Sequence, residues 1–544
     1  MQFPNQKRSP GRVSFGFIAG LMGIAVCLAA AVPAFAATPG DTKALRRADK
    51  ALREGEYESA EKLFRDLLAK DTHDNPARLG LSYALLKQRI LQEAYDHAAR
   101  VILTDPLSSR AHALMGAAVL ASGDFRNSVE EFRTALSLQE NQSLAIAGLA
   151  MVDFYENRLD SALKGLRRAV DLDSEEPDYL FNLGQACARN ERYKEAADSY
   201  ERFLIIAPKT DADRRARIRG LIDFLRYLGQ QNKLYDLGGK NRTEIPFAPV
   251  DGRPVLKVRV NGGKELLRFV LDTGSGMSVI SEETAKKLGL RPVARGGLAR
   301  AVGGGGKFEI VYGFLSSLEL GEVRIDNVPV YIRHFFDDKA PVDGYLGLSV
   351  ISRFIASVDY GNNNFSLRRP SNNPSDQDPA AAKTWRGEEQ QPVATGTLEI
   401  PVRTTSSGFI SGEVMVEGIE NPQNFIIDTG ASVSVVSEKL AEQEDLGSYL
   451  QPTRMKVFGA AGVAEDVKTL LLPRVLLGTF AREKVNAAVL DLEPLNETAG
   501  FTQNGILGAN FLRHFCVSFD FPRGVIRLEP IIKTPKAVST PRPM

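Results

Sequence analysis

Cysteine and histidine are scarce in this chain of 544 residues. Of its three cysteines, Cys27 lies in an apolar N-terminal run, whereas Cys187 and Cys516 stand far apart in the sequence. This leaves neither a disulfide framework nor the spacing of a zinc site. The five histidines form no metal-binding motif. The sequence therefore predicts that the protein uses no metal and no other cofactor.

An excess of charge of one sign is missing as well. Lys and Arg total 68 against 67 for Asp and Glu, which gives a formal net charge of +1. Such neutrality gives no electrostatic reason to expect a nucleic-acid partner. The composition, 43% hydrophobic and 25% charged, is ordinary for a soluble globular protein, and the length is sufficient for several domains.

The first 36 residues have the pattern of a secretory signal peptide. A basic start is followed by an apolar run from about Phe15 to Val32 and then by Pro33-Ala34-Phe35-Ala36, a small-x-small cleavage site. We expect cleavage after Ala36 and an exported, periplasmic or secreted protein. Because the apolar run is long for a signal core, an uncleaved membrane anchor is the alternative, and only then is the membrane an expected partner.

Residues 41–210 contain five repeats of 34 residues, which start at positions 41, 75, 109, 143 and 177. In each repeat a small residue occupies the twentieth position, and an aromatic residue or leucine precedes it by three. The small residues are Ala60, Ala94, Ser128, Ala162 and Ala196. Period and pattern resemble the tetratricopeptide repeat, a helix-turn-helix unit. We expect an all-α solenoid over 41–235, closed by a capping helix from Ala212 to about Lys233.

Tetratricopeptide arrays have a concave surface that holds peptides or partner proteins, so the resemblance implies a protein partner or a peptide substrate in that groove. A rigid spacer or an oligomerisation arm is the alternative. The arginines of the capping helix, Arg214, Arg215, Arg217 and Arg219, could form a binding strip. A solvated helix face is the commoner reason for such a run, and we favour it.

From about residue 243, short apolar runs alternate with glycine turns, which is typical of β-structure. We expect a first β-domain over 243–370 and a second over 395–531. The segment 371–394 between them is rich in Asn, Pro, Ser, Asp, Gln and Ala, the composition of a flexible linker. Residues 532–544 are expected to form a disordered tail.

One motif occurs in both β-domains. Residues 269–275 read FVLDTGS and residues 425–431 read FIIDTGA. A single Asp-Thr-Gly often marks only a strand end, where Asp accepts hydrogen bonds in a turn and Gly adopts a positive φ. Here a second pair of blocks follows, with DGYLG at 343–347 and NGILG at 504–508. The repetition predicts two related domains.

Both β-domains resemble the retroviral-type aspartic peptidase unit, which combines the Asp-Thr-Gly turn with the later apolar-apolar-Gly element. Pepsin-like members carry two such units in one chain, and retroviral ones form a homodimer. The resemblance implies two facing barrel domains with Asp272 and Asp428 as a catalytic dyad. Carboxylates about 3 Å apart cannot both ionise readily, so the pair holds one proton. The ionised member activates a water, and the protonated member donates to the scissile carbonyl oxygen.

The resemblance also assigns roles to neighbouring residues. The threonines of the two turns would hydrogen-bond across the interface, and the glycines would leave room for the opposite domain. Ser275 would hydrogen-bond the adjacent carboxylate, which Ala431 cannot do, so we expect an asymmetric dyad. The supporting turn residues are Thr273, Gly274, Ser275, Thr429, Gly430 and Ala431. The candidate residues for two glycine-rich flaps are Gly303, Gly304, Gly305, Gly459 and Ala460.

The sequence therefore predicts a multidomain α + β protein, in which a tetratricopeptide solenoid precedes two all-β aspartic-peptidase-like barrels. The function it favours is an exported aspartic endopeptidase. Two alternatives stay open at this point. The β-domains could form a non-catalytic adaptor that binds peptides or proteins, or each domain could act by pairing with its counterpart in another chain.

Overall fold

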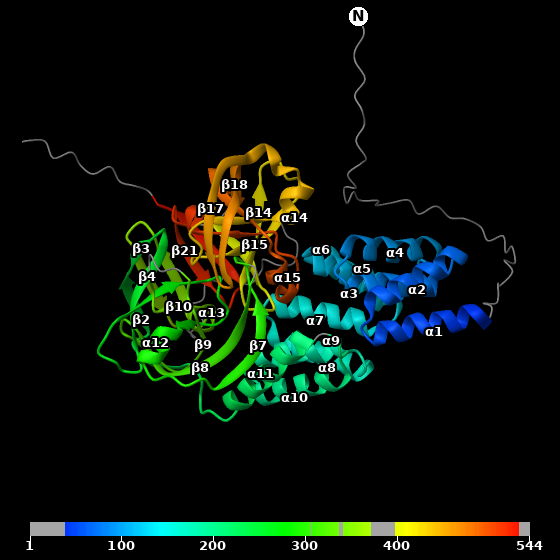
Figure 1. Cartoon of the computed structure of the whole chain (residues 1–544), viewed down its shortest axis with the longest axis horizontal. Helices are drawn as coiled ribbons and strands as arrows, with labels where there is room; N and C mark the ends of the chain where they lie inside the picture. Colours follow the sequence, from blue (N-terminus) through cyan, green and yellow to red (C-terminus); the bar gives the residue numbers. More distant parts are fainter. Residues whose placement is uncertain (1–38, 211, 305, 337–340, 371–397, 532–544) are drawn as a thin grey trace, which may run out of the picture.

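The computed structural model describes residues 39–210, 212–304, 306–336, 341–370 and 398–531 (Figure 1). The predicted leader, linker and tail, at 1–36, 371–394 and 532–544, lie outside these residues, as does Gly305. None of the helices in the described ranges is both long and apolar enough to span a membrane.

The N-terminal region is an array of antiparallel helix pairs that lies beside the β-domains (Figure 1). Its helices are α1 (Pro39–Arg53), α2 (Tyr57–Lys70), α3 (Asn75–Lys87), α4 (Leu91–Thr104), α5 (Ser109–Ser122), α6 (Phe125–Leu138), α7 (Ser143–Tyr155), α8 (Leu159–Leu172), α9 (Pro177–Arg189), α10 (Tyr193–Ile206) and α11 (Ala212–Leu228). The aromatic residue or leucine of each repeat begins the second helix of its pair. The small residue three positions later is buried, as Ala60 and Ala162 are, so paired helices approach closely.

Contacts inside the array connect its early and late repeats. Lys87 at the end of α3 pairs with Glu176 and Asp178 at the start of α9, at 2.8 and 2.6 Å. Gly55, in the turn between α1 and α2, packs against Pro208, which follows α10. These contacts bridge the first two repeats to the fifth.

The first β-domain forms a sheet in the order β1-β9-β6-β10-β5-β4-β8-β7, with β3 paired to β4. Its elements are β1 (Asp236–Gly239), β2 (Arg242–Pro246), β3 (Ala248–Val250), β4 (Arg253–Val260), β5 (Leu267–Leu271), β6 (Val279–Ser281), α12 (Glu282–Lys287), β7 (Ala294–Arg300), β8 (Lys307–Leu320), β9 (Val323–Arg333), β10 (Gly344–Leu346), α13 (Leu348–Ile351), β11 (Ile355–Asp359) and β12 (Asn364–Arg368). Strand β1 precedes the predicted start at 243 and pairs with β9. Its sequence DLGG lacks apolar alternation, which explains why the pattern did not reveal it.

The second β-domain repeats this arrangement, with the order β17-β18-β19-β16-β20-β15-β14. Its elements are β13 (Leu398–Thr404), β14 (Ile410–Val416), β15 (Gln423–Ile427), β16 (Ser434–Ser437), α14 (Glu438–Gln443), η3 (Leu446–Tyr449), β17 (Leu450–Gly459), β18 (Gly462–Leu477), β19 (Phe480–Leu490), α15 (Glu493–Ala499), β20 (Gly505–Leu507), α16 (Ala509–Leu512), β21 (Phe515–Asp520) and β22 (Val525–Pro530). Helix α15 lies between this domain and the helical array (Figure 1).

A shared antiparallel sheet joins the two domains. Its order is β13-β22-β21-β11-β12-β2, so each domain contributes three strands. At its centre Ser357 of β11 pairs with Ser518 of β21, the equivalent residue of the second copy, and the two hydroxyls hydrogen-bond at 2.9 Å. The pairing of equivalent residues places a local two-fold axis here. The two domains therefore face each other as related halves of one body.

The helical array docks against both β-domains. Phe224 of α11 stacks on Tyr312 of β8 with ring centroids 4.1 Å apart. Phe501 of the second domain is fully buried in the core of the array, where its ring lies 4.9 Å from Phe125 and 5.1 Å from Tyr155. The array thus belongs to the same packed unit as the two sheets.

Candidate active site

Each repeated Asp stands at the end of a buried strand. Asp272 follows β5 and Asp428 follows β15, and each strand pairs in parallel with the second repeated block of its own domain, β10 or β20. The amide of Asp272 donates to the Leu346 carbonyl at 3.0 Å, and the amide of Asp428 donates to the Leu507 carbonyl at the same distance. These bonds fix the two turns in equivalent ways.

A serine six residues after each Asp secures this arrangement. The Ser278 hydroxyl accepts a hydrogen bond from the Gly347 amide at 3.0 Å. In the second domain the Ser434 hydroxyl accepts from the Gly508 amide at 3.1 Å. The serine therefore ties the Asp-Thr-Gly turn to the apolar-apolar-Gly element, which explains why these two blocks recur together in the sequence.

The two turns are bound to each other by their threonines. The Thr273 hydroxyl donates to the Ile427 carbonyl, and the Thr429 hydroxyl donates to the Leu271 carbonyl, both at 2.7 Å. Each hydroxyl also accepts the amide of the opposite threonine, at 3.0 and 3.2 Å. Both side chains are 0% exposed. Water therefore cannot replace these bonds, and the turns are held at a fixed separation.

The glycines of the turns allow each backbone to touch the opposite carboxylate. A Cβ built on Gly274 would lie 2.3 Å from Cγ of Asp428, and one built on Gly430 would lie 2.5 Å from Oδ1 of Asp272. Neither distance is compatible with a side chain. The structure therefore brings Asp272 and Asp428 together within one chain.

The environment of the pair shifts both carboxyl groups. Burial raises the pKa of Asp272 well above its usual range, and the charge of Asp428 raises it further. Burial also raises the pKa of Asp428, while hydrogen bonds from the amides of Gly430, Ala431 and Gly274 oppose the increase. Both pKa values are therefore raised in one buried site, which favours a single proton held between the two carboxyl groups.

Ser275 distinguishes the two turns. Its hydroxyl hydrogen-bonds the carboxyl of Asp272 and lowers the pKa of that group, in opposition to burial. At the equivalent position Ala431 contributes only its backbone amide to Asp428. The dyad is therefore asymmetric in its hydrogen bonds.

Two hairpins meet tip to tip at the domain interface. The tip between β7 and β8 contains Gly303 and Gly304, and the tip between β17 and β18 contains Ala460. A Cβ on Gly303 would lie 2.8 Å from Cα of Gly459, and one on Gly304 would lie 2.6 Å from Cα of Gly462. The flap candidates in the described residues therefore lie at these tips, where glycine permits backbone contact.

Each flap is also bound to the opposite domain by an arginine that no sequence pattern singled out. Arg300 on the first flap lies 3.0 Å from Glu497 and 3.8 Å from Asp491 of the second domain. Arg333 of the first domain donates to the carbonyl of Ala460 on the second flap. Both contacts join residues more than one hundred positions apart, so no local motif could reveal them.

A turn of the second domain connects the helical array to the first Asp-Thr-Gly turn. Arg189 of α9 donates to the carbonyls of Thr405 and Ser406, the latter at 3.3 Å. The next residue, Ser407, has its carbonyl 2.2 Å from where a Cβ on Gly276 would lie. The array therefore supports a segment that packs directly beside the candidate site.

Within the described residues, no group of three or more His, Cys, Asp or Glu side chains could hold a metal ion. The chemistry available from this arrangement is that of two adjacent, buried carboxyl groups.

Comparisons with known proteins agree with this architecture. The family model described as Aspartyl protease matches the chain twice, over residues 256–350 and 412–511. Two models described as Tetratricopeptide repeat match residues 51–118 and 147–210. A comparison with curated proteins gives no match.

Several solved structures are similar to the helical part. TTC0263, a thermophilic tetratricopeptide protein from Thermus thermophilus, is 20% identical with a TM-score of 0.30, covering 34% of this chain and 98% of that one. A MamA fragment from Desulfovibrio magneticus is 20% identical with a TM-score of 0.23, covering 31% and 97%. Taken together, the family matches show that the chain is a tetratricopeptide-repeat array fused to tandem domains of the aspartyl protease family.

Proposed function

We propose that the protein is an aspartic endopeptidase in which Asp272 and Asp428 form one catalytic dyad. The observation that carries the proposal is the contact of each turn glycine with the opposite carboxylate, because it requires the two acids to share one site. The threonine hydrogen bonds hold this geometry without a partner chain. A site completed by a second molecule is therefore unnecessary.

In the proposed reaction Asp428 is ionised and Asp272 carries the proton. Asp428 removes a proton from a bound water as the water oxygen attacks the peptide carbon. Asp272 donates its proton to the carbonyl oxygen, which gives a neutral tetrahedral diol. When the diol collapses, one of its hydroxyl protons returns to Asp272, and Asp428 transfers its proton to the leaving nitrogen. The C–N bond then breaks and the dyad is restored with a single proton.

The flaps and the array complete the proposal. Closed hairpin tips would exclude bulk water, which strengthens the electrostatic effect of the carboxyl groups. Tetratricopeptide repeats are protein-interaction modules, and we propose that surfaces of this array left free by the β-domains recruit a protein substrate or partner. Export is part of the proposal on the strength of the signal-like pattern in the first 36 residues.

The experiment is cleavage of a diverse peptide mixture by the purified chain. We expect Asp272→Asn and Asp428→Asn each to lower turnover by at least about 100-fold, because the dyad acts as a unit. Asp198→Asn is the matched control, since this side chain lies at the array surface in an exposed pair with Arg226. Turnover that survives in either dyad variant, while both remain folded, would contradict a single shared site.

A further inference from the structure

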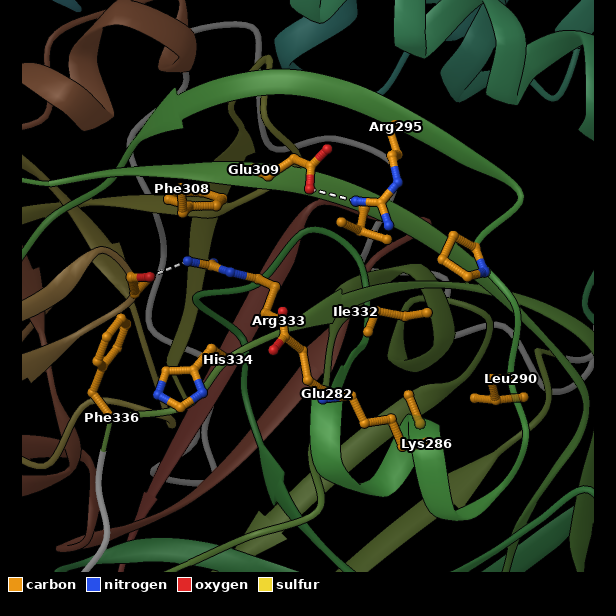
Figure 2. Close-up of a pocket in the computed structure, with 14 residues that line it drawn as sticks. Glu282, Lys286, Leu290, Arg295, Phe308, Glu309, Ile332, Arg333, His334 and Phe336 are labelled. Carbon is orange, nitrogen blue, oxygen red and sulfur yellow. Dashed lines mark hydrogen bonds and ion pairs between the residues drawn. The ribbon is translucent and has the colours of Figure 1, made fainter.

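Arg333 occupies an unusual position at the end of β9. Figure 2 shows its side chain extending beneath Phe308, and the guanidinium carbon lies 3.7 Å from the centre of that ring. The guanidinium donates to the Ala460 carbonyl at the tip of the second flap. It therefore lies between the two flaps, in contact with both.

The Arg333 guanidinium has no carboxylate partner in the part of the chain that the structure describes. Among the described residues, no carboxylate lies within 4.0 Å of the Arg333 guanidinium, and its polar partner there is a neutral carbonyl. Burial lowers the pKa of Arg333 to about 10. Arg295 in the same pocket is different, because it pairs with Glu309 and is largely exposed. The Arg333 side chain is half-buried, and a partly desolvated guanidinium without a carboxylate partner among the described residues favours an incoming anion.

The pocket beside Arg333 is large enough for a side chain. It has a volume of about 400 Å³ and is lined by residues of α12, β7, β8 and β9 (Figure 2). Ala460 of the opposite flap also lines it. Two residues beyond Arg333, Phe335 packs edge-on against Tyr345 with centroids 5.0 Å apart. Tyr345 immediately precedes Leu346, whose carbonyl holds the Asp272 amide. These contacts connect the segment that follows Arg333 with strand β10, which positions Asp272.

The second domain has a different surface at the equivalent place. At the end of β19, Leu490 and Leu492 form an apolar cluster with Val435 and Val467, and Val302 from the tip of the first flap packs against it. One side of the site therefore presents a cation beside a cavity, and the other presents packed aliphatic side chains. A peptide that crosses this site meets different chemistry at its two ends.

We propose that Arg333 is a specificity-determining residue that binds a carboxylate of the substrate, so that the enzyme prefers peptides with Asp or Glu next to the first domain. This inference rests on the proposed peptidase function. Other charged residues line the same pocket. The charges of Glu282 and Lys286 of α12 cancel, and Arg295 pairs with Glu309. Arg333 supplies the remaining positive charge, and binding a substrate carboxylate would replace its contact with a neutral carbonyl.

The test uses pairs of peptides that differ only by Glu or Gln at one position, scanned over four residues on each side of the cleaved bond. For the wild-type chain we expect kcat/KM to favour Glu by about 10- to 100-fold at one position. Arg333→Gln should reduce this ratio to near one, and Arg333→Lys should retain part of it. Arg295→Gln is the matched control in the same pocket and should keep the wild-type ratio.

Two results would overturn the inference. One is a wild-type enzyme without a Glu preference at any position. The other is Arg333→Gln lowering kcat/KM equally for both members of a pair, which would mean that Arg333 only fastens the flap. Calorimetric binding of the same pairs to Asp272→Asn separates this question from catalysis. A Glu preference in binding without cleavage by the wild type would refute the peptidase proposal and leave the role of Arg333 intact.

Discussion

The two β-domains share their strands and their Asp-Thr-Gly turns, but they contact the helical array in different ways. The first domain meets the array through its flap: a Cβ on Gly220 of α11 would lie 2.0 Å from the Arg295 carbonyl of β7. The second domain inserts Phe501 into the array and receives Arg189 on its β13–β14 turn. Elements that hold the dyad have kept the symmetry of the duplication, and elements that reach the array have lost it.

The difference suggests that residues at the two-fold axis and elements at the periphery have separate roles. Residues that touch the two-fold axis occur as equivalent pairs, as in the threonine hydrogen bonds and in Ser357 with Ser518. Helix α15 has no counterpart among the described elements of the first domain, and its Glu497 binds Arg300 of the first flap. The equivalent residues at the axis hold the two turns together, and peripheral elements without a counterpart attach the β-domains to the array.

The largest expected effect comes from a change at the symmetric centre. Gly274→Ala and Gly430→Ala should each lower turnover by at least about 100-fold, because the new methyl group would displace the opposite carboxylate by an ångström or more. Equal losses in both variants would confirm that the halves contribute equally. Gly447→Ala is the control, since its Cβ would meet only Asp445 at 3.5 Å. A glycine variant with normal turnover would show that the turns are farther apart than described.

The second prediction concerns the asymmetric periphery. Phe501→Ala removes a fully buried ring from the aromatic cluster with Phe125 and Tyr155, so we expect a loss of about 3–5 kcal/mol in the free energy of unfolding. Chemical denaturation measures it, with Leu107→Ala as control because that side chain is 74% exposed. If the loss is below about 1 kcal/mol, the array and the second domain do not unfold together.

The repeated positions of the symmetric part could be recognised in the sequence. The Asp, Thr, Gly and Ser positions were identifiable because each acts within a short turn, and the same spacing recurs in both copies. The repeats of the array were equally recognisable in the sequence. The residues that begin each second helix, and the small residues at which that helix packs, follow a fixed period. Short-range physical requirements leave a pattern in the sequence.

The asymmetric part could not be predicted in this way. Arg333, Arg300 and Phe501 act through contacts with residues remote in the chain, and nothing in their local sequence distinguishes them. The arginines of α11 illustrate the same limit, because the favoured solvated face was wrong for three of them. The guanidinium carbon of Arg214 lies 4.5 Å from the centre of the Phe181 ring. Arg215 donates to the Leu204 carbonyl at 2.7 Å and Arg217 donates to the Leu298 carbonyl of β7 at 3.2 Å.

A third prediction addresses the difference between Ser275 and Ala431. The Ser275 hydroxyl lowers the pKa of Asp272, so Ser275→Ala should raise the pKa of the dyad and move the pH profile of kcat/KM toward higher pH. Ala431→Ser adds a donor to Asp428 and should move the profile toward lower pH. Each shift is expected with less than about a tenfold change in the maximal rate. Profiles that stay superimposed would mean that the dyad is insensitive to this hydroxyl.

The smallest effect is expected at the ion pairs between the first flap and α15. Arg300 and Glu497 are each about 40% exposed, so Arg300→Gln should cost no more than about 1 kcal/mol of stability. Its effect should appear instead as a severalfold change in KM, because the flap is released from one of its contacts with the opposite domain. Since exposed pairs are screened by salt, the wild type should approach the variant at about 1 M salt. Arg126→Gln serves as control and should leave KM unchanged, because the Arg126 side chain is 86% exposed in its pair with Glu130 in the array. A salt-independent KM in the wild type would show that the apolar contact of Val302, rather than this ion pair, holds the first flap against the second domain.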